Sequence, residues 1–469
     1  MRRPNVLLVV LDTARADALE PYGAATGASP TVAQLASRGK AHRAVHATAN
    51  WTVPSHASMF TGLLPRRLGL TQIPGERPHG ARPILEKHRD RLLAEVLRRN
   101  GYRTGAVSTN LWLTEETGFE LGFERFRTIS PNRQLRLASP RARSRVKWAA
   151  NAVLARVDDG AADAAAVLRE WAAEPSDRPF FWFVNLVECH SPYLPPKPYN
   201  DLGPLQRLRA AEEARKYLTL DAIWRACAGR LGFEEEALAR MRRLYAGAVR
   251  YMDDWLAGVL QALDDAGRLD DTLVLVTSDH GENFGENGLV VHAFSLDDRL
   301  VRVPLVTAGP VELPLEEPGS LMGLPRALAR ALDIDDHPWQ ERTPLPVAQA
   351  DPPAPRSDPR VDRAIAEWGL GEEAAWRIST QITAVADGRF KLVRQGDVEQ
   401  LHDLSLDPLE AAPLDTVPAG EEARVAALRT ALQDPAVWAA PDGAPSPAPA
   451  ADPEEVEALE RQMRLLGYL

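Results

Sequence analysis

Short, continuous apolar runs constrain the fold of this chain more than any other feature. The first, Val6–Leu11, contains only Val and Leu. Similar runs recur further along the chain, at Thr104–Val107, Phe180–Leu186, Thr272–Thr277 and Val303–Val306. A run without polar alternation is typical of a strand that is buried on both faces, as in a parallel sheet. The runs therefore predict a core of buried strands.

Segments with helical periodicity lie between these runs. Thr31–Arg38 and Arg91–Arg99 are short, whereas Phe233–Ala266 is long. The alternation of strands and helices predicts an α/β fold with a mostly parallel sheet sandwiched by helices. In such sheets the active site gathers at the carboxyl ends of the strands. Asp12 and Asp279 each follow an apolar run, so we expect both at that edge.

Changes in composition suggest how the chain is divided. Residues 1–342 are predicted to form the main α/β domain, with a helical cap insertion at 138–243. Residues 343–359 are rich in Pro and Asp and suggest a linker. A small C-terminal α+β subdomain is expected at 360–440, followed by a second linker and a terminal helix within 441–469.

The charge balance limits the classes of partner. The 469 residues carry a formal net charge of −10, and mildly acidic chains are poor candidates for nucleic-acid binding. An Arg-rich stretch at 133–147 is the exception, and we interpret it as a solvated face rather than a docking edge for an anionic substrate. The two cysteines, Cys189 and Cys227, do not indicate a disulfide framework.

The apolar run near the N-terminus superficially suggests a signal peptide. It is too short for one, and it stops at Asp12 without a small-residue cleavage site. No other segment approaches the length of a membrane span. We therefore expect a cytoplasmic protein with neither a nucleic-acid nor a membrane partner, and the oligomeric state stays open.

Two motifs offer metal-ligating side chains. In the first, Asp12 follows its strand, where a carboxylate is well placed for a divalent cation, although Asp is equally common as a helix N-cap. In the second, Asp279 and His280 are adjacent, so both can reach one metal ion, and Gly281 allows the chain to turn sharply.

A third motif, Trp51–Gly62, offers a nucleophile. Pro54 suits the first turn of a helix, which would place Thr52 at a helix N-terminus. The helix dipole and the free N–H groups there favour a bound anion and an alkoxide. The alternative is that Thr52 is merely the N-cap residue of that helix.

The order of these motifs resembles the sulfatase branch of the alkaline-phosphatase superfamily. Its nucleophile segment usually reads Cys or Ser, any residue, Pro, Ser, Arg, and then Thr-Gly. Here Thr52 stands at the nucleophile position and His56 at the Arg position. Threonine has a methyl group on Cβ and cannot yield the formylglycine aldehyde, so Thr52 would attack as a plain alkoxide. The combination of Asp12, Thr52, Asp279 and His280 also resembles the phosphonate monoester hydrolase and lipoteichoic-acid synthase branches.

The resemblance also implies roles for the other site residues. His190 resembles the family's His-x-Pro-Tyr element, which contacts the ester, and His292 stands where relatives carry a His or Lys near the leaving group. Asn110 and His56 are expected to touch the substrate. The implied metal ligands are Asp12, Thr52, Asp279 and His280. Three oxygens and one imidazole suit one divalent ion, with Mn²⁺ or Zn²⁺ favoured over Ca²⁺ or Mg²⁺.

These roles predict a metal-dependent hydrolase of phosphate or phosphonate esters that acts on a small anionic ester. The reaction would pass through a covalent phosphothreonine at Thr52. Three alternatives remain open: sulfate-ester hydrolysis without formylglycine, phosphoryl transfer to an alcohol, and non-catalytic anion binding.

Overall fold

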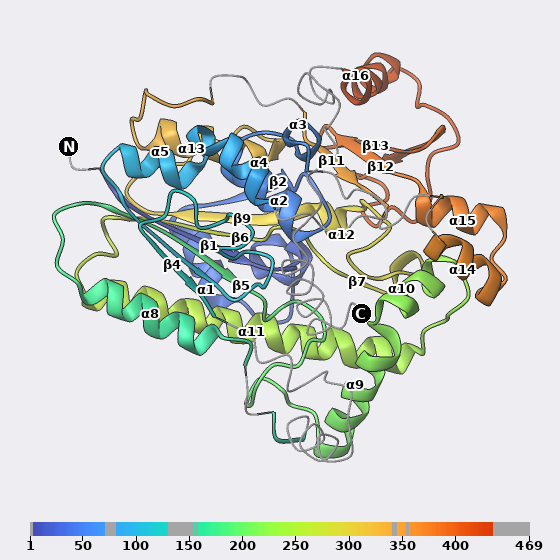
Figure 1. Ribbon diagram of the computed structural model, residues 1–469, viewed down its shortest axis with the longest axis horizontal. Coiled ribbons are helices and arrows are strands. Elements are labelled where there is room, and N and C mark those ends of the chain that lie inside the picture. Colours follow the sequence, from blue (N-terminus) through green and yellow to red (C-terminus); the bar gives the residue numbers. More distant parts are fainter. Residues whose placement is uncertain are drawn as a thin grey trace.

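The core of the protein is an eight-stranded sheet with the order β10-β2-β9-β6-β1-β5-β3-β4, seen in a computed structural model (Figure 1). The structure describes residues 3–70, 81–129, 153–155, 158–339, 345–352, 356–357 and 359–434. The strands of this sheet are β1 (Asn5–Leu11), β2 (Lys40–His46), β3 (Arg103–Ser108), β4 (Arg125–Thr128), β5 (Phe180–Leu186), β6 (Thr272–Thr277), β9 (Arg302–Ala308) and β10 (Gly319–Ser320).

The sheet is mostly parallel, as the sequence predicts. β1 runs parallel to β5 and β6, and β3 runs parallel to β4 and β5. β9, which contains the predicted run Val303–Val306, differs because it runs antiparallel to β2 and β6. The chain between β6 and β9 holds only short elements and no long crossover helix, which a parallel return would need.

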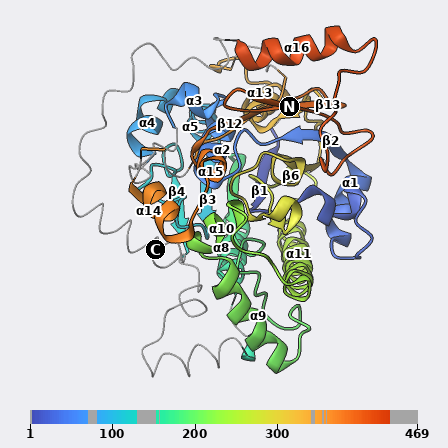
Figure 2. The same ribbon diagram turned by 90° about the vertical axis from the view of Figure 1, so that its right-hand side faces the viewer.

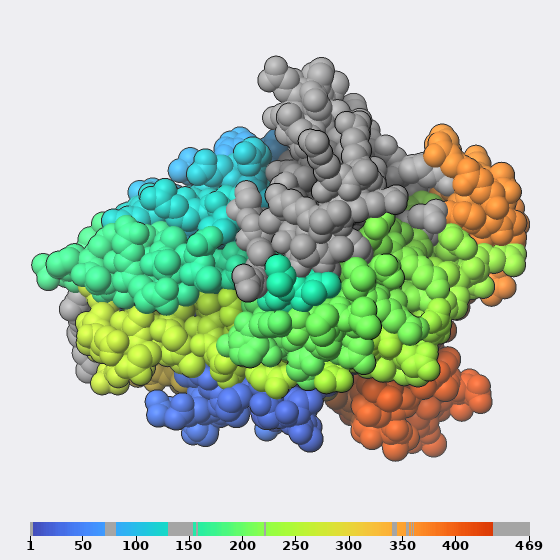
Figure 3. Space-filling model, turned by 90° about the horizontal axis from the view of Figure 1, so that it is seen from below, coloured from blue at the N-terminus to red at the C-terminus, as the bar shows by residue number. Residues whose placement is uncertain are grey.

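Helices cover both faces of this sheet (Figures 1 and 2). On one face α1 (Pro30–Arg38), α8 (Ala161–Ala173) and α11 (Glu235–Asp265) pack against alternate residues of the strands, such as Leu7 and Val9. Figure 3 views the molecule from the side of these helices. On the other face lie α2 (Thr52–Thr61), α4 (Arg82–Lys87), α5 (Leu93–Arg99) and α13 (Leu324–Ala331). Because both faces are covered, every residue of β1 beyond Asn5 is buried, which explains the unbroken apolar run.

A buried carboxylate joins two of these helices. Asp253 of α11 accepts hydrogen bonds of 2.9 Å from the backbone N–H groups of Thr31 and Val32, in the first turn of α1. These N–H groups have no partner inside their own helix, so the carboxylate satisfies them and matches the positive end of the helix dipole.

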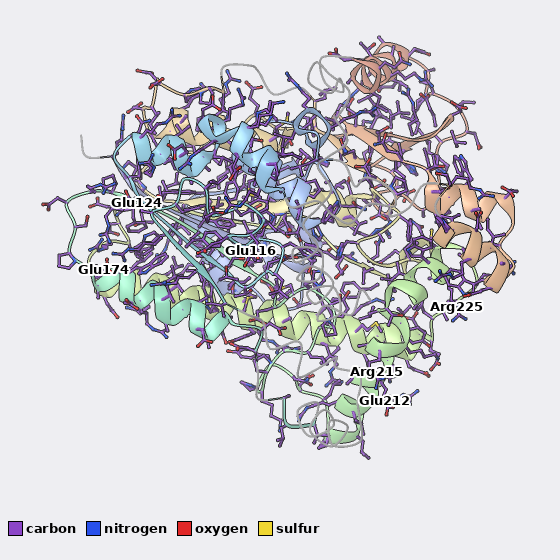
Figure 4. All side chains as sticks on the ribbon, in the orientation of Figure 1. Glu116, Glu124, Glu174, Glu212, Arg215 and Arg225 are labelled. Carbon is purple, nitrogen blue, oxygen red and sulfur yellow. The ribbon has the colours of Figure 1, made fainter. Side chains whose placement is uncertain are left out.

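Ion pairs link the residues at the amino ends of β3 and β4. Glu174, just beyond α8, pairs with Arg103 and Arg125, each at 2.6 Å, and Figure 4 shows it at one end of the molecule near Glu124. Glu124 in turn pairs with Arg178. The charged residues at the amino ends of these strands therefore form structural ion pairs. The predicted site residues lie at the opposite edge of the sheet.

A second, antiparallel sheet lies near the C-terminus, with the order β11-β12-β13-β14. Its strands are β11 (Val347–Ala350), β12 (Ile382–Ala386), β13 (Phe390–Gln395) and β14 (Val398–Asp403), and α16 (Glu422–Gln433) packs on one face. The prediction of a linker at 343–359 is wrong for β11, which pairs with β12. The sequence around this short strand is rich in Pro and Asp, and this composition indicated a linker rather than a strand.

The prediction of a helical cap at 138–243 also needs correction. This range contains β5, which lies between β1 and β3 in the central sheet, and α8, which covers that sheet. Of the described helices in the range, α9 (Pro204–Tyr217) and α10 (Leu220–Cys227) lie beyond the sheet (Figure 1). The Arg-rich stretch at 133–147 and the predicted C-terminal helix lie outside the described residues. The division of the chain into domains therefore stays a prediction.

In the part of the chain that the structure describes, no helix combines the length and the apolar character that crossing a membrane requires.

Candidate active site

Three ligand atoms converge where β1 and β6 end. Asp12 directly follows β1, and Asp279 and His280 follow β6. One ligand atom from each of these residues lies within 4.8 Å of the other two, and all three residues are completely buried. Because β1 and β6 are adjacent and parallel, their ends bring together side chains that are 267 positions apart in sequence.

The three residues each leave one polar atom without a partner. Among the described residues, nothing forms a hydrogen bond with Asp12 Oδ1, Asp279 Oδ2 or His280 Nε2, although all are buried. His280 Nδ1 lies 3.1 Å from the Gly281 carbonyl oxygen and so carries the proton, which leaves the Nε2 lone pair exposed to the cluster. Buried polar atoms without partners are costly. Two carboxylate oxygens and an imidazole nitrogen are suitable ligands for one divalent cation, so these residues fit a metal site.

The electrostatics of the cluster also favour a bound cation. Burial, together with Asp279, raises the pKa of Asp12 to about 7, and burial raises the pKa of Asp279 to about 7 as well. Burial and the neighbouring His292 lower the pKa of His280 to about 4. The neutral imidazole can therefore act as a ligand, while the two carboxylates lack a compensating charge.

These shifts predict how the stability of the metal-free protein depends on pH. A carboxyl group whose pKa is raised in the folded state stabilises the protein at pH values below its ordinary pKa, and this contribution is lost as pH rises through the folded-state value. The melting temperature of metal-free protein should therefore fall between pH 4 and about pH 7 because of Asp12 and Asp279. Calorimetry in a chelator would measure this decrease, and Asp12→Asn should reduce it. A melting temperature that rises over this range in wild type but not in Asp12→Asn would contradict the assignment.

Thr52 places its hydroxyl group beside this cluster. It is the first residue of α2, and Trp51 occupies the N-cap position, so Thr52 is not the N-cap residue. Asn110 Nδ2 lies 3.4 Å from Thr52 Oγ1, and the hydroxyl also interacts with the Asp279 carboxylate. The side chain is 4% exposed. The hydroxyl thus lies at a helix N-terminus and faces the candidate ligands.

Asn110 connects Thr52 to the ligand cluster. Its Nδ2 donates a hydrogen bond of 2.6 Å to Asp12 Oδ2, and its Oδ1 accepts one of 2.8 Å from the backbone N–H of Trp112. Because the second bond fixes which way the amide faces, the N–H₂ group is directed at Asp12 and Thr52. The predicted substrate residue Asn110 is therefore inside the cluster.

Two further histidines flank the cluster. The ring centroids of His292 and His280 are 4.6 Å apart, and those of His292 and His190 are 4.9 Å apart. His292 Nδ1 lies 3.0 Å from Oε1 of Glu282, which is completely buried. This contact places the proton on Nδ1, so Nε2 is the atom that can exchange a proton with a substrate. Glu282 was not among the predicted site residues, although its place directly after Asp279, His280 and Gly281 was a signal for it.

The predicted substrate contact of His56 stays a prediction. His56 is completely buried, with Nδ1 2.9 Å from the Thr52 carbonyl oxygen and its ring among Phe60, Phe119 and Phe183. Burial lowers its pKa to about 3. The neutral ring lies beside the first turn of α2, and its Nδ1 is 3.5 Å from Asp279 Oδ2.

Thr13, which follows Asp12, adds another buried polar atom. Its backbone has a φ of 61°, a conformation that is uncommon outside glycine, and its N–H donates to Asp279 Oδ1 at 3.3 Å. Among the described residues, no group forms a hydrogen bond with its hydroxyl oxygen, which is buried. The loop after β1 is thus held in an unusual conformation beside the ligand cluster.

Comparisons with known proteins show what this chain is similar to. The protein-family model described as Sulfatase matches residues 4–332. A choline-sulfatase from Rhizobium meliloti is 33% identical over 204 residues, which are 42% of this chain and 37% of that protein. The multifunctional alkaline phosphatase superfamily protein PehA from Trinickia caryophylli is 25% identical over 364 residues, 65% of this chain and 68% of that protein. The matched part thus spans little more than a third of the choline-sulfatase.

Solved structures share the fold over nearly the whole chain. The phosphonate monoester hydrolase of Agrobacterium radiobacter has a TM-score of 0.61 and 21% identity, with 98% of this chain and 96% of that chain covered. A 2-O GAG sulfatase, BT1596, has a TM-score of 0.62 and 16% identity, with 93% and 92% covered.

Proposed function

This chain belongs to the sulfatase family, and we propose that it is a metal-dependent hydrolase of phosphate or phosphonate esters with Thr52 as its nucleophile. One observation carries the proposal. The Thr52 hydroxyl lies at the N-terminus of α2, beside three buried ligand atoms that have no hydrogen-bond partner among the described residues. The substrate would be a small anionic ester.

Asp12, Asp279 and His280, together with Thr52, would hold the metal ion. When bound, a divalent ion supplies positive charge that favours an ionised hydroxyl and offsets the charge of the ester. Three oxygen ligands and one imidazole favour Mn²⁺ or Zn²⁺, with Ca²⁺ and Mg²⁺ as alternatives.

The other residues would orient the reactants. Asn110 donates to Thr52 Oγ1, which leaves the hydroxyl proton free to face Asp279. The first turn of α2 directs its N–H groups and its dipole toward the developing negative charge. As the bond from Thr52 Oγ1 to phosphorus forms, the hydroxyl proton would pass to the Asp279 carboxylate and the ester bond would break. His190 would contact the phosphoryl oxygens.

His292 would transfer protons at the leaving group. Glu282 holds its Nδ1, so a proton on Nε2 can pass to the departing oxygen. The Nε2 atom can then accept a proton from the water that attacks the phosphothreonine, and the proton held by Asp279 would return to Thr52 Oγ1 as the Oγ1–P bond breaks. An alcohol in place of that water would give phosphoryl transfer.

Sulfate-ester hydrolysis is the second candidate, favoured by the choline-sulfatase at 33% identity. Threonine weakens it, because formylglycine releases sulfate by eliminating it from an aldehyde hydrate, and a threonine ester has no such route. A sulfothreonine would have to be hydrolysed directly.

A substrate panel tests the proposal. Nitrophenyl phosphate monoester, diester, phosphonate and sulfate should be assayed with added Mn²⁺, Zn²⁺ or Ca²⁺. We expect one of the phosphorus esters to react fastest, and we expect a chelator to abolish that reaction. Mass spectrometry after rapid quenching should detect a phosphoryl group on Thr52. Faster turnover of the sulfate ester would favour the second candidate, and no turnover of any ester would favour anion binding alone.

A further inference from the structure

The two faces of the C-terminal sheet are covered by different parts of the chain. Side chains alternate along a strand, so one set faces α16 and the other faces the segment 296–301 of the larger domain. The first set includes Val347, Val385, Phe390 and Leu392. The second set, Ala348, Ala350, Ile382 and Ala384, packs against Leu296, Leu300 and Val301. Figure 1 shows α16 on one side of β12 and β13, and α12 (Asp298–Val301) toward the central sheet.

Lys391 of β13 alternates with Phe390 and Leu392 and so belongs to the second face. It is 1% exposed, and its Nζ lies 2.8 Å from Asp298 Oδ1 and 3.0 Å from Glu410 Oε1. Glu410 also accepts a hydrogen bond from the backbone N–H of Asp298. The C-terminal region therefore binds both the side chain and the backbone of the first residue of α12.

The charge of Lys391 is maintained in this buried position. Burial alone would lower the pKa of Lys391, but Asp298 and Glu410 raise it above its ordinary value. Burying a charged pair is expensive, and an apolar side chain could fill such a site at lower cost. A buried ion pair is therefore better explained by the geometry that it imposes than by stability alone.

The segment bound by Lys391 contacts the loops that carry the site. Asn50, two residues before Thr52, donates a hydrogen bond of 3.2 Å to the Ser295 carbonyl oxygen. Gly281, next to His280, donates one of 2.7 Å to the Leu300 carbonyl oxygen. The two backbones are so close that a Cβ at Gly281 would lie 1.8 Å from the Arg299 carbonyl oxygen.

We propose that Lys391 is a positioning residue, which fixes segment 295–301 and through it the relative placement of Thr52 and His280. A residue of the small sheet would thus align two loops of the larger domain without touching the substrate. The expected effect on turnover rests on the proposed function, whereas the effect on loop order can be measured without any substrate.

A matched pair of variants tests this inference. Lys391→Met removes the ammonium group and keeps an unbranched side chain. Arg394→Met, three residues further along β13, removes a partly exposed pair with Glu399 on the other face and serves as the control. Hydrogen exchange followed by mass spectrometry should show exchange at least about tenfold faster in peptides spanning 279–282 and 295–301 in the first variant only. For the best ester of the panel, kcat should fall roughly 10- to 100-fold with little change in KM, since misplacement of reacting groups affects the chemical step.

A second variant separates alignment from stability. Lys391→Met leaves Asp298 and Glu410 without their shared ammonium partner, so Lys391→Met/Glu410→Gln removes one of the two carboxylates. We expect this double variant to regain part of the melting temperature while exchange stays fast and kcat stays low. If exchange and kcat match those of Arg394→Met, the ion pair only stabilises the fold and the inference is wrong. Failure of the double variant to fold would overturn it too, because Lys391 would then serve folding itself. A wild-type protein without esterase activity would refute the proposed function, and the exchange result would still decide the role of Lys391.

Discussion

Thr52→Ala is expected to lower kcat for the preferred ester by roughly 10⁴- to 10⁶-fold, the range seen when a nucleophile is removed. Alanine retains the backbone of α2 and leaves three of the four proposed ligands, Asp12, Asp279 and His280, so metal should still bind, although more weakly than to wild type. Steady-state kinetics with saturating metal would measure the loss in kcat. Isothermal titration would show whether the metal affinity is retained.

Thr52→Ser is the matched control for this experiment. Serine keeps the hydroxyl group and loses only the methyl group, so we expect activity within about tenfold of wild type, an effect of less than about 1.4 kcal/mol on the barrier. A phosphoryl group should be trapped on the serine but not on the alanine. If Thr52→Ala retains wild-type kcat, Thr52 has only a structural role.

Asp279→Asn is expected to weaken metal binding by more than about 100-fold, because even residues that only support a ligand cost 10- to 100-fold. The substitution removes one anionic ligand from a completely buried site. It also removes one of two carboxylates whose pKa is raised, so the metal-free variant should melt at a higher temperature than metal-free wild type at pH 8. Weaker metal binding together with a higher melting temperature of the metal-free variant would distinguish a metal ligand from a carboxylate with a purely structural role.

Asp271→Asn provides the control for that variant. Asp271 is exposed and immediately precedes β6, the strand whose other end leads to Asp279. Metal affinity and metal-free melting temperature should both stay at their wild-type values. Titration calorimetry with Mn²⁺ and with Zn²⁺ would measure the affinities. Unchanged metal affinity in Asp279→Asn would remove Asp279 from the proposed ligand set.

The apolar runs in the sequence predicted the buried strands and the mostly parallel direction of the central sheet. Val6–Leu11 and Phe180–Leu186 are buried on both faces, and such strands need apolar residues at every position. The direction of β9 was not predictable in this way, because an apolar run is compatible with either orientation. β11 was missed since its four residues lie in a stretch rich in Pro and Asp.

The sequence shows which residue stands at each position, but the groups that surround its side chain were harder to predict. Nothing in the sequence indicated that the ring of His56 packs among the aromatic rings of Phe60, Phe119 and Phe183. The sequence did not predict roles for Glu282 and Lys391, because their partners His292 and Asp298 lie on other elements. Partners of this kind depend on how loops and sheets pack, which local sequence does not encode.

By itself, the sequence determined that the chain is an α/β protein of the sulfatase family. It also determined that position 52, where the resemblance predicts the nucleophile, holds a threonine, which has no route to formylglycine. These properties follow from the chemistry of single residues and from short periodic patterns. Only the tertiary structure decided that Asp12, Asp279 and His280 leave three buried atoms facing one another beside Thr52. The physical reason is that the adjacency of β1 and β6 and the docking of α2 set those distances, and both arise from contacts between residues far apart in the chain.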